Sequence, residues 1–354
     1  MNNMKKSAIA VAVAAVLAAP VALAEVSISG GLQAELRSVD GDGGMRDGLY
    51  ATDGGEYTSE NGGSYGFIKF SASEDLGDGL KAIAMWNGAV NVGDSNAAGG
   101  MTGRDSYVGL SGGFGTVLAG TLSTPYKSST VGWDPLVMTS LQARGNGGMS
   151  DLHNGYASNA IAYAGTFGAA KVVAAIVLDE GNDPTNATDT NGEHAMSFSV
   201  NAPVGPVELA VAHVAADKFS DVNNLGLGAT ATLVGASTFN DLSATKVGVK
   251  WVSGDLTVAG QYEMLTVNTI DPTVVNVNVS YKMGNNTLVA SVGQTDWDVA
   301  NTDETTYMAV AVKHAFSKNT TGWVGYRSTD VGNLYAPAPD QDETSLSAGL
   351  RVAF

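Results

Sequence analysis

The sequence contains no cysteine and few positive charges: 18 of its 354 residues are lysine or arginine, against 35 aspartates and glutamates. Without cysteine, no disulfide can hold the chain together. A net charge of −17 disfavours nucleic-acid binding, because contacts to phosphate depend on lysine and arginine. Beyond residue 24 there is no run of about 18 apolar residues, which excludes a membrane-spanning helix. A chain of this kind can cross a membrane only as a closed barrel of strands.

The first 24 residues have the layout of a secretory signal peptide. Two lysines at 5–6 precede an apolar stretch at 8–17, and the small residues of "ALA" at 22–24 come directly before Glu25. We therefore expect cleavage before Glu25 and a single domain over residues 25–354. A membrane anchor is the alternative, but the stretch is short of the roughly 20 residues that span a bilayer.

Apolar and polar residues alternate along much of the remaining chain. In "VVNVNVSY" (274–281), Val277 falls on one face and Asn278 on the other, and "ATKVGVKW" (244–251) and the terminal "SLSAGLRVAF" (345–354) alternate in the same way. A period of two is typical of strands with one buried and one polar face. The polar faces carry Asn, Ser, Lys and Glu, which a two-sheet sandwich could not bury in its core.

The connections between these segments come in two lengths that alternate along the chain. Short ones are rich in turn residues, as in "DLGDG" (75–79), whereas long ones such as 38–62 are acidic and rich in glycine. An antiparallel meander with short turns at one rim and long loops at the other gives this rhythm. The pattern predicts an all-β transmembrane barrel of about 16 strands of ~10 residues, within the range of single-chain outer-membrane barrels.

Two stretches carry a more specific signal. "GFIKFSASEDLGDGLKAIAMW" (66–86) and "RDSYVGLSGGFGTVLAGTLSTPY" (104–126) resemble successive hairpins of the Gram-negative general diffusion porins. The resemblance extends over nearly the whole chain. It implies a homotrimeric outer-membrane channel for small hydrophilic solutes, surrounded by lipid and lipopolysaccharide. It also implies a third long loop, about 122–157, that folds into the lumen, and a last strand, ending in Phe354, that the barrel-assembly machinery recognises.

In this family, basic residues of the wall face acidic residues of the third loop. Arg104 matches one of the arginines, and Asp134 is the only acidic residue between 122 and 150. Leu118 and Ala162 stand where relatives commonly carry basic residues, which predicts a weak field. We assign to the constriction Asp134, Arg104, Lys69, Lys81 and Arg37, and to the lumen wall Lys246, Lys250, Glu263 and Arg351. Acidic external loops together with Asp134 then predict a mild preference for cations.

Two other functions are compatible with an outer-membrane barrel. A barrel-type hydrolase would need a catalytic cluster, and "GGSYG" (62–66) matches the G-x-S-x-G motif but is followed by an alternating strand instead of a helix. A substrate-specific channel would show a row of aromatic residues along the lumen, and few lumen positions are aromatic. An oxygen-rich stretch at 179–193 lacks the spacing of a known calcium loop. We predict a channel with no catalytic residues, no metal site and no cofactor.

Overall fold

The computed structural model describes residues 24–42, 47–52, 65–90, 92, 102–178, 194–216, 241–300, 302–331 and 342–354. The predicted signal peptide, apart from residue 24, and the oxygen-rich stretch at 179–193 lie outside these residues. So do residues 62–64 of the G-x-S-x-G match.

Strands make up most of this structure. In chain order they are β1 (Glu25–Gly41), β2 (Gly48–Thr52), β3 (Phe67–Gly77), β4 (Leu80–Ala89), β5 (Thr102–Gly103), β6 (Ser106–Gly112), β7 (Gly115–Leu122), β8 (Ala157–Phe167), β9 (Ala170–Leu178), β10 (His194–Val204), β11 (Val207–Ala216), β12 (Leu242–Ser253), β13 (Leu256–Val267), β14 (Thr273–Met283), β15 (Asn286–Asp296), β16 (Thr305–Ala315), β17 (Thr320–Asp330) and β18 (Asp342–Ala353). Three short helical segments, α2 (Pro125–Thr130), η1 (Val131–Trp133) and η2 (Asp151–His153), lie between β7 and β8.

The eighteen strand segments occupy sixteen positions in one sheet. β2 and β3 both pair with β1, at residues 35–39 and 25–31 respectively, so they are two segments of one barrel strand. β5 and β6 share the neighbour β4 in the same manner. Subtracting these two duplications from the eighteen segments gives 18 − 2 = 16 strands. The predicted strand number is confirmed.

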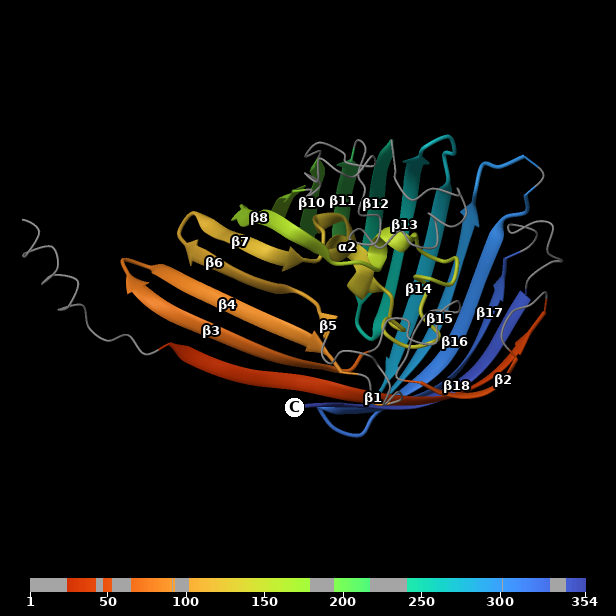
Figure 1. Cartoon of the computed structure of the whole chain (residues 1–354). Coiled ribbons are helices and arrows are strands. Elements are labelled where there is room, and N and C mark those ends of the chain that lie inside the picture. Colours follow the sequence, from red (N-terminus) through yellow and green to blue (C-terminus); the bar gives the residue numbers. More distant parts are fainter. Residues whose placement is uncertain are drawn as a thin grey trace, which may run out of the picture.

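The sheet closes on itself because its first and last strands pair. β1 and β18 run antiparallel from Gly31 opposite Ala353 to Gly41 opposite Glu343. Figure 1 shows the strands curving into a single ring, with β18 beside β1. Closure gives every described strand of the sheet a neighbour on both sides, which is the condition for a sheet to stand in lipid.

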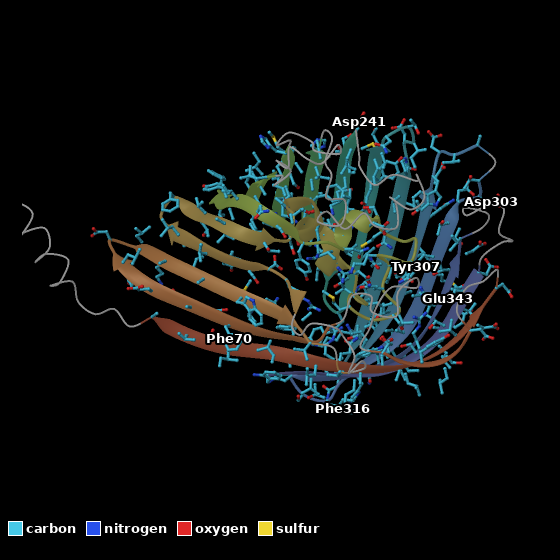
Figure 2. The ribbon with its side chains drawn as sticks, viewed as in Figure 1. Phe70, Asp241, Asp303, Tyr307, Phe316 and Glu343 are labelled. Carbon is cyan, nitrogen blue, oxygen red and sulfur yellow. The ribbon has the colours of Figure 1, made fainter. Side chains whose placement is uncertain are left out.

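The two faces of each strand differ as the alternation predicts. Val277 is 39% exposed on the outside, whereas its neighbour Asn278 is only 3% exposed on the inside. Figure 2 shows Phe70 on the outside and Tyr307 within the ring. The outer face is thus apolar, whereas the inner face carries polar side chains together with buried apolar ones such as Leu242, Leu265 and Trp323.

One rim is built mostly from tight two-residue turns, and a four-residue connection, 316–319, joins β16 to β17 there. Gly254 and Gly284 begin the turns between β12 and β13 and between β14 and β15, with φ values of 57° and 60°. This left-handed conformation suits glycine because it has no Cβ to clash. The short connections read from the sequence therefore all serve one purpose: they join antiparallel neighbours at the same rim.

Among the residues that the structure describes, no helix has both the length and the apolar character needed to span a membrane.

Candidate functional site: the lumen and its constriction loop

The segment between β7 and β8, residues 123–156, lies inside the ring of strands, and we call it the constriction loop (Figure 1). It opens with α2, where the Oγ1 atom of Thr124 accepts a hydrogen bond from Lys127 N at 3.1 Å. Pro125 occupies the first helical turn, where a missing N–H costs nothing. The predicted folding of this loop into the lumen is confirmed.

Both ends of the constriction loop attach to a single carboxylate of β13. Glu263 is fully buried, and its Oε2 atom accepts hydrogen bonds from Tyr126 Oη at 2.7 Å and from Ser150 Oγ at 2.5 Å. Tyr126 belongs to α2 at the beginning of the loop, whereas Ser150 lies near its end. One wall residue therefore holds the loop at both ends.

A histidine and a lysine complete this attachment. Lys246 Nζ, on β12, lies 2.8 Å from His153 Nε2, and His153 Nδ1 lies 3.0 Å from the carbonyl oxygen of Ser150. These contacts fit a neutral ring that donates through Nδ1 and accepts through Nε2. Burial and the charge of Lys246 lower the pKa of His153 to about 3. We call Tyr126, Ser150, His153, Lys246 and Glu263 the latch.

A second attachment fixes the middle of the loop. Glu35 of β1 accepts hydrogen bonds from Ser140 N at 3.1 Å and from Ser140 Oγ at 2.5 Å. On β16, three strands from β1 in the sheet, Tyr307 Oη donates to the carbonyl oxygen of Leu141 at 2.5 Å. Each contact places a charged or phenolic wall group against loop backbone, so loop atoms replace the water that would otherwise solvate the wall.

Residues of the constriction loop pack closely against inward-facing glycines of the wall. A Cβ atom at Gly248 would lie 2.7 Å from the ring of Trp133, and one at Gly293 would lie 2.5 Å from the Cα of Gly148. A Cβ atom at Gly325 would likewise lie too close to the side chain of Leu141. Any larger residue at these positions would push the loop away from the wall. None of these glycines was singled out from the sequence, although a glycine at an inward position in mid-strand is the signal for such a close approach.

Two wall cations hold the loop by its carbonyl oxygens. Lys313 Nζ, on β16, donates to Pro135 O at 2.7 Å, and an amino group of Arg351, on β18, donates to Met138 O at 3.2 Å. Arg351 also packs 3.9 Å from the centre of the Tyr65 ring. Arg351 was predicted on the lumen wall, whereas Lys313 was not singled out.

Further positive charges gather where the loop returns to β8. Lys127 Nζ lies 3.7 Å from the centre of the Tyr156 ring, and the charges of Arg104 and Arg144 both act on the Tyr156 hydroxyl. Arg104 is 8% exposed, and its Nη1 atom lies 3.4 Å from the carbonyl oxygen of Tyr65. Together these residues form a cationic and aromatic border beside the loop.

Asp134 does not face Arg104 across the lumen, which corrects the geometry expected from the sequence. Its two carboxylate oxygens accept hydrogen bonds from Leu136 N at 2.8 Å and from Ala143 N at 2.9 Å. The side chain is 1% exposed, and burial raises its pKa. Asp134 therefore closes a turn within the loop, because two backbone N–H groups that no strand can satisfy need an acceptor.

The remaining predicted cations are spread around the wall. Arg37 is 3% exposed and donates to Glu343 at 2.5 Å. Lys250 forms an ion pair of 2.7 Å with Glu208. Lys69 is partly exposed on β3, and Lys81 is exposed beside the short turn that joins β3 to β4. Of the predicted set, the structure brings only Lys246 and Glu263 together, in the latch.

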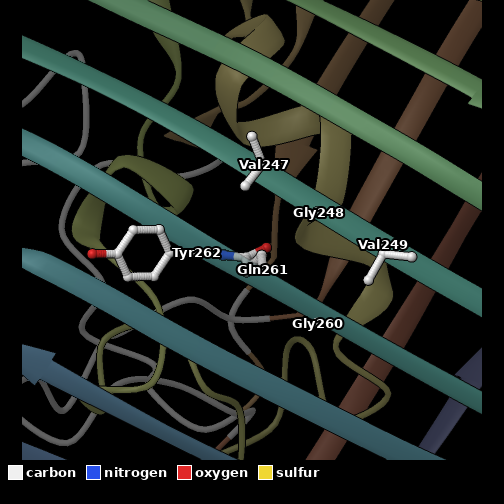
Figure 3. Close-up of a pocket in the computed structure, with 6 residues that line it drawn as sticks. All are labelled: Val247, Gly248, Val249, Gly260, Gln261 and Tyr262. Carbon is white, nitrogen blue, oxygen red and sulfur yellow. The ribbon is translucent and has the colours of Figure 1, made fainter.

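A hollow of about 330 Å³ lies in the outer wall between β12 and β13 (Figure 3). It is lined by Val247, Gly248, Val249, Gly260, Gln261 and Tyr262. Gly260 leaves the space open, and the apolar side chains around it are exposed on the outside. The hollow therefore belongs to the lipid-facing surface and is separate from the lumen.

The described part of the chain contains no group of three or more His, Cys, Asp or Glu side chains placed to hold a metal ion. The inward-facing acids instead accept hydrogen bonds from the loop or from neighbouring cations, as Glu35, Asp134 and Glu263 do.

Comparison with known proteins gives a consistent picture. A family model described as Gram-negative porin matches residues 9–334. The major outer membrane protein P.IB of Neisseria gonorrhoeae is 36% identical over 129 residues, which are 36% of this chain and 34% of that protein. The major outer membrane protein P.IA of Neisseria meningitidis is 43% identical over 72 residues, 20% of this chain and 17% of that protein. The matched segments thus span about a third of these relatives or less.

Solved structures match over a greater length. An anion-selective porin from Comamonas acidovorans superimposes with a TM-score of 0.71 at 19% identity, covering 94% of this chain and all of that one. The trimer form of OmpT of Vibrio cholerae has a TM-score of 0.63 at 17% identity, covering 94% of this chain and 99% of that one. At these identities the similarity concerns the fold alone.

Proposed function

The chain belongs to the Gram-negative porin family, and from this premise we propose that it carries small hydrophilic solutes and ions through the outer membrane by passive diffusion in a water-filled lumen. The observation that carries the proposal is the closed ring of sixteen strands with polar inner faces. Where the constriction loop does not cover these inner faces, their polar side chains are stable only when water fills the lumen.

Family and fold point to a channel and not to an enzyme. The serine of the G-x-S-x-G match lies outside the described residues, and the segment after it continues directly into β3, an alternating strand. A nucleophile elbow instead requires a helix after the serine. The alternative of a substrate-specific channel has one observation in its favour, the Lys127–Tyr156 and Arg351–Tyr65 stacks, which put aromatic rings on the lumen side.

For ion preference we propose a constriction that favours anions. The mild cation preference expected from the sequence depended on Asp134, which is enclosed in the loop and capped by two N–H groups. In its place stand Arg104, Lys127 and Arg351, which contact carbonyl oxygens of Tyr65, of Asn154 and of Met138 beside the lumen. The structural relative from Comamonas acidovorans is itself described as anion-selective.

The acidic external loops would act against this preference, but only at low salt. The Debye length is about 3 Å at 1 M salt and about 30 Å at 0.01 M. The electric field of the acidic external loops therefore reaches the constriction only in dilute solution. Cations in the constriction act on a passing ion at a few ångströms and are screened much less.

We further propose that the mature chain begins at Glu25 and forms a homotrimer in the outer membrane, surrounded by phospholipid and lipopolysaccharide. β18 would carry the signal for the barrel-assembly machinery, with Phe354 as its terminal aromatic residue. Phe354 is 58% exposed on the outer face, where another protein can reach it.

Planar-bilayer recording of the purified protein tests both proposals. We expect stable single-channel conductance in KCl, and reversal potentials that favour chloride at 1 M salt and shift toward potassium as salt is diluted. Absence of conductance would contradict the channel. Cation preference at 1 M, reduced by replacing Asp134 with asparagine, would restore the expectation from the sequence and contradict the anion-favouring constriction.

A further inference from the structure

Two of the lumen cations, Arg351 and Lys313, differ from the others in what surrounds them. Both are partly exposed, and both donate to the same short loop segment, Lys313 to Pro135 O at 2.7 Å and Arg351 to Val137 O at 3.3 Å. The two strands β16 and β18 thus direct their positive charges to one place. That place lies toward the rim of the short turns, because both residues are within a few positions of the strand ends at that rim.

Neither cation forms an ion pair within 4 Å in the described structure, and the charges of Glu35 and Asp134 act on Arg351 and Lys313 only from a greater distance. Within the described structure, Arg351 contacts Gln33, two carbonyl oxygens of the loop and the rings of Tyr65 and Trp323, whereas Lys313 contacts one carbonyl oxygen. These neutral oxygen acceptors bind some of the N–H groups of Arg351 and Lys313 but do not cancel the positive charge of either side chain. By contrast, Lys250 pairs with Glu208 at 2.7 Å, and Arg37 with Glu343 at 2.5 Å.

Each of the two side chains also has N–H donors that the contacts described above do not use. A guanidinium has five N–H groups and an ammonium has three. The Nε atom of Arg351 donates to Gln33 Oε1 at 2.8 Å and its Nη2 atom to the loop, which leaves Nη1 for a ligand. Lys313 uses one N–H on Pro135 and keeps two. The Tyr65 ring, 3.9 Å from the guanidinium, fixes the plane of the fork.

The geometry points to a binding site for dianionic oxyanions, such as sulfate or a phosphomonoester, formed by Arg351 and Lys313 on the short-turn side of the constriction loop. We infer this site from two cations that form no direct ion pair, keep unused donors and converge on one loop segment. A tetrahedral dianion offers an oxygen to each cation and balances both charges, whereas chloride balances one. The inference rests on the proposed channel function and gives it a preferred class of solute.

The site predicts an asymmetric, competitive effect of dianions on chloride current. Sulfate added from the short-turn side of a single inserted trimer at low ionic strength is expected to reduce chloride conductance in a saturable manner. Glycerol phosphate should act like sulfate at pH 8. Below its second pKa of about 6 it becomes a monoanion, and its effect should fall while that of sulfate remains.

Substitutions localise the effect. Replacing Arg351 or Lys313 by glutamine removes one charge-assisted contact and should weaken inhibition by sulfate about tenfold. Lys171→Gln is the matched control, because Lys171 is an exposed inward-facing cation of β9 near the same rim. Should the glutamine variant of Arg351 fail to assemble, Arg351→Lys retains a charge but loses the fork and should weaken inhibition less.

The result separates this site from the channel itself. Normal KCl conductance with saturable inhibition by sulfate that disappears in the Arg351 and Lys313 variants supports the site. Normal KCl conductance with equal sensitivity in wild type, Lys313→Gln and Lys171→Gln overturns the site and leaves the channel in place. Absence of KCl conductance in the wild type would instead contradict the proposed channel.

Discussion

The two sides of the barrel differ in what covers their inner faces. On β13–β18, inward side chains such as Glu263, Asn276 and Arg327 are buried beneath the constriction loop. On β3, β4, β6 and β7, almost every inward residue remains at least partly exposed. The open water path therefore lies off-centre, along β3–β7. The polar inner face thus has two roles. On the covered side it binds the constriction loop, and on the open side it forms the wall of the channel.

The largest effect is expected from breaking the latch on the covered side. Glu263→Ala removes the acceptor of Tyr126 and Ser150 and leaves Lys246 buried without a counter-charge. Loss of one partner from a buried charged group costs about 3–5 kcal/mol. We expect a lowered denaturation midpoint of the detergent-solubilised barrel and noisy, larger conductance.

The matched control for this change is Glu208→Ala. Glu208 pairs with Lys250, but both side chains are about 30% exposed, at 31% and 28%. An exposed pair contributes roughly 0–1 kcal/mol. Equal destabilisation by the two substitutions would show that the latch does not hold the loop.

Adding a charge on each face gives the next largest effect. Lysine at Val277 faces lipid and should cost about 2–4 kcal/mol near the bilayer midplane. Lysine at Ser71, an inward and partly exposed position of β3, should be tolerated because it meets water. Asn278 also faces inward, but it is 3% exposed and donates to Asn276 at 2.5 Å, so lysine there should destabilise as well.

Urea unfolding from detergent micelles measures these three variants, and labelling of cysteines at the same positions reports solvent access. If Asn278→Lys were as well tolerated as Ser71→Lys, the distinction between the covered and the open side would be lost.

The latch also predicts a dependence of stability on pH. The pKa of His153 is lowered to about 3, from an ordinary value of 6.5. As pH falls below 6.5, the unfolded chain takes up a proton that folded His153 does not, so stability is lost progressively down to about pH 3. At pH 5 the loss is roughly 2 kcal/mol.

Thermal midpoints of the barrel between pH 7 and pH 4 should therefore fall more steeply for the wild type than for His153→Gln. Other groups also titrate in this range, so the difference between the two proteins is the quantity to compare. Parallel pH profiles would contradict a buried, neutral His153.

The smallest effect concerns a pair of glycines on neighbouring strands. Gly248→Ala places a methyl group 2.7 Å from Trp133 of the constriction loop, and we expect a cost of about 1 kcal/mol and a change in conductance. Gly260→Ala points outward into the hollow of Figure 3, where the nearest atom is 3.4 Å away, and should change neither. If only the Gly260 variant changed the conductance, the assignment of Gly248 to the inner face and of Gly260 to the outer face would be wrong.

The sequence predicts the strands of the wall better than it predicts which side chains contact one another in the lumen. Arg104 and Asp134 were expected to face each other, but Asp134 accepts hydrogen bonds from its own loop. Lys246 and Glu263 lie buried on the inner face, and their partners His153 and Tyr126 come from a loop whose path the alternation does not encode. Lys313 was not singled out, although it reaches the same loop segment as Arg351.

The sequence by itself determined the barrel: alternation with a period of two set which side chains face lipid, and the spacing of turns and loops set the strand number. These are local signals, since each strand repeats the same pattern and each short turn joins neighbours in the chain. Only the tertiary structure decided which inward residues line water and which hold the constriction loop. Contacts such as that of Glu35 with Ser140, 105 residues away, depend on where the loop crosses the lumen, and glycines of distant strands fix that path.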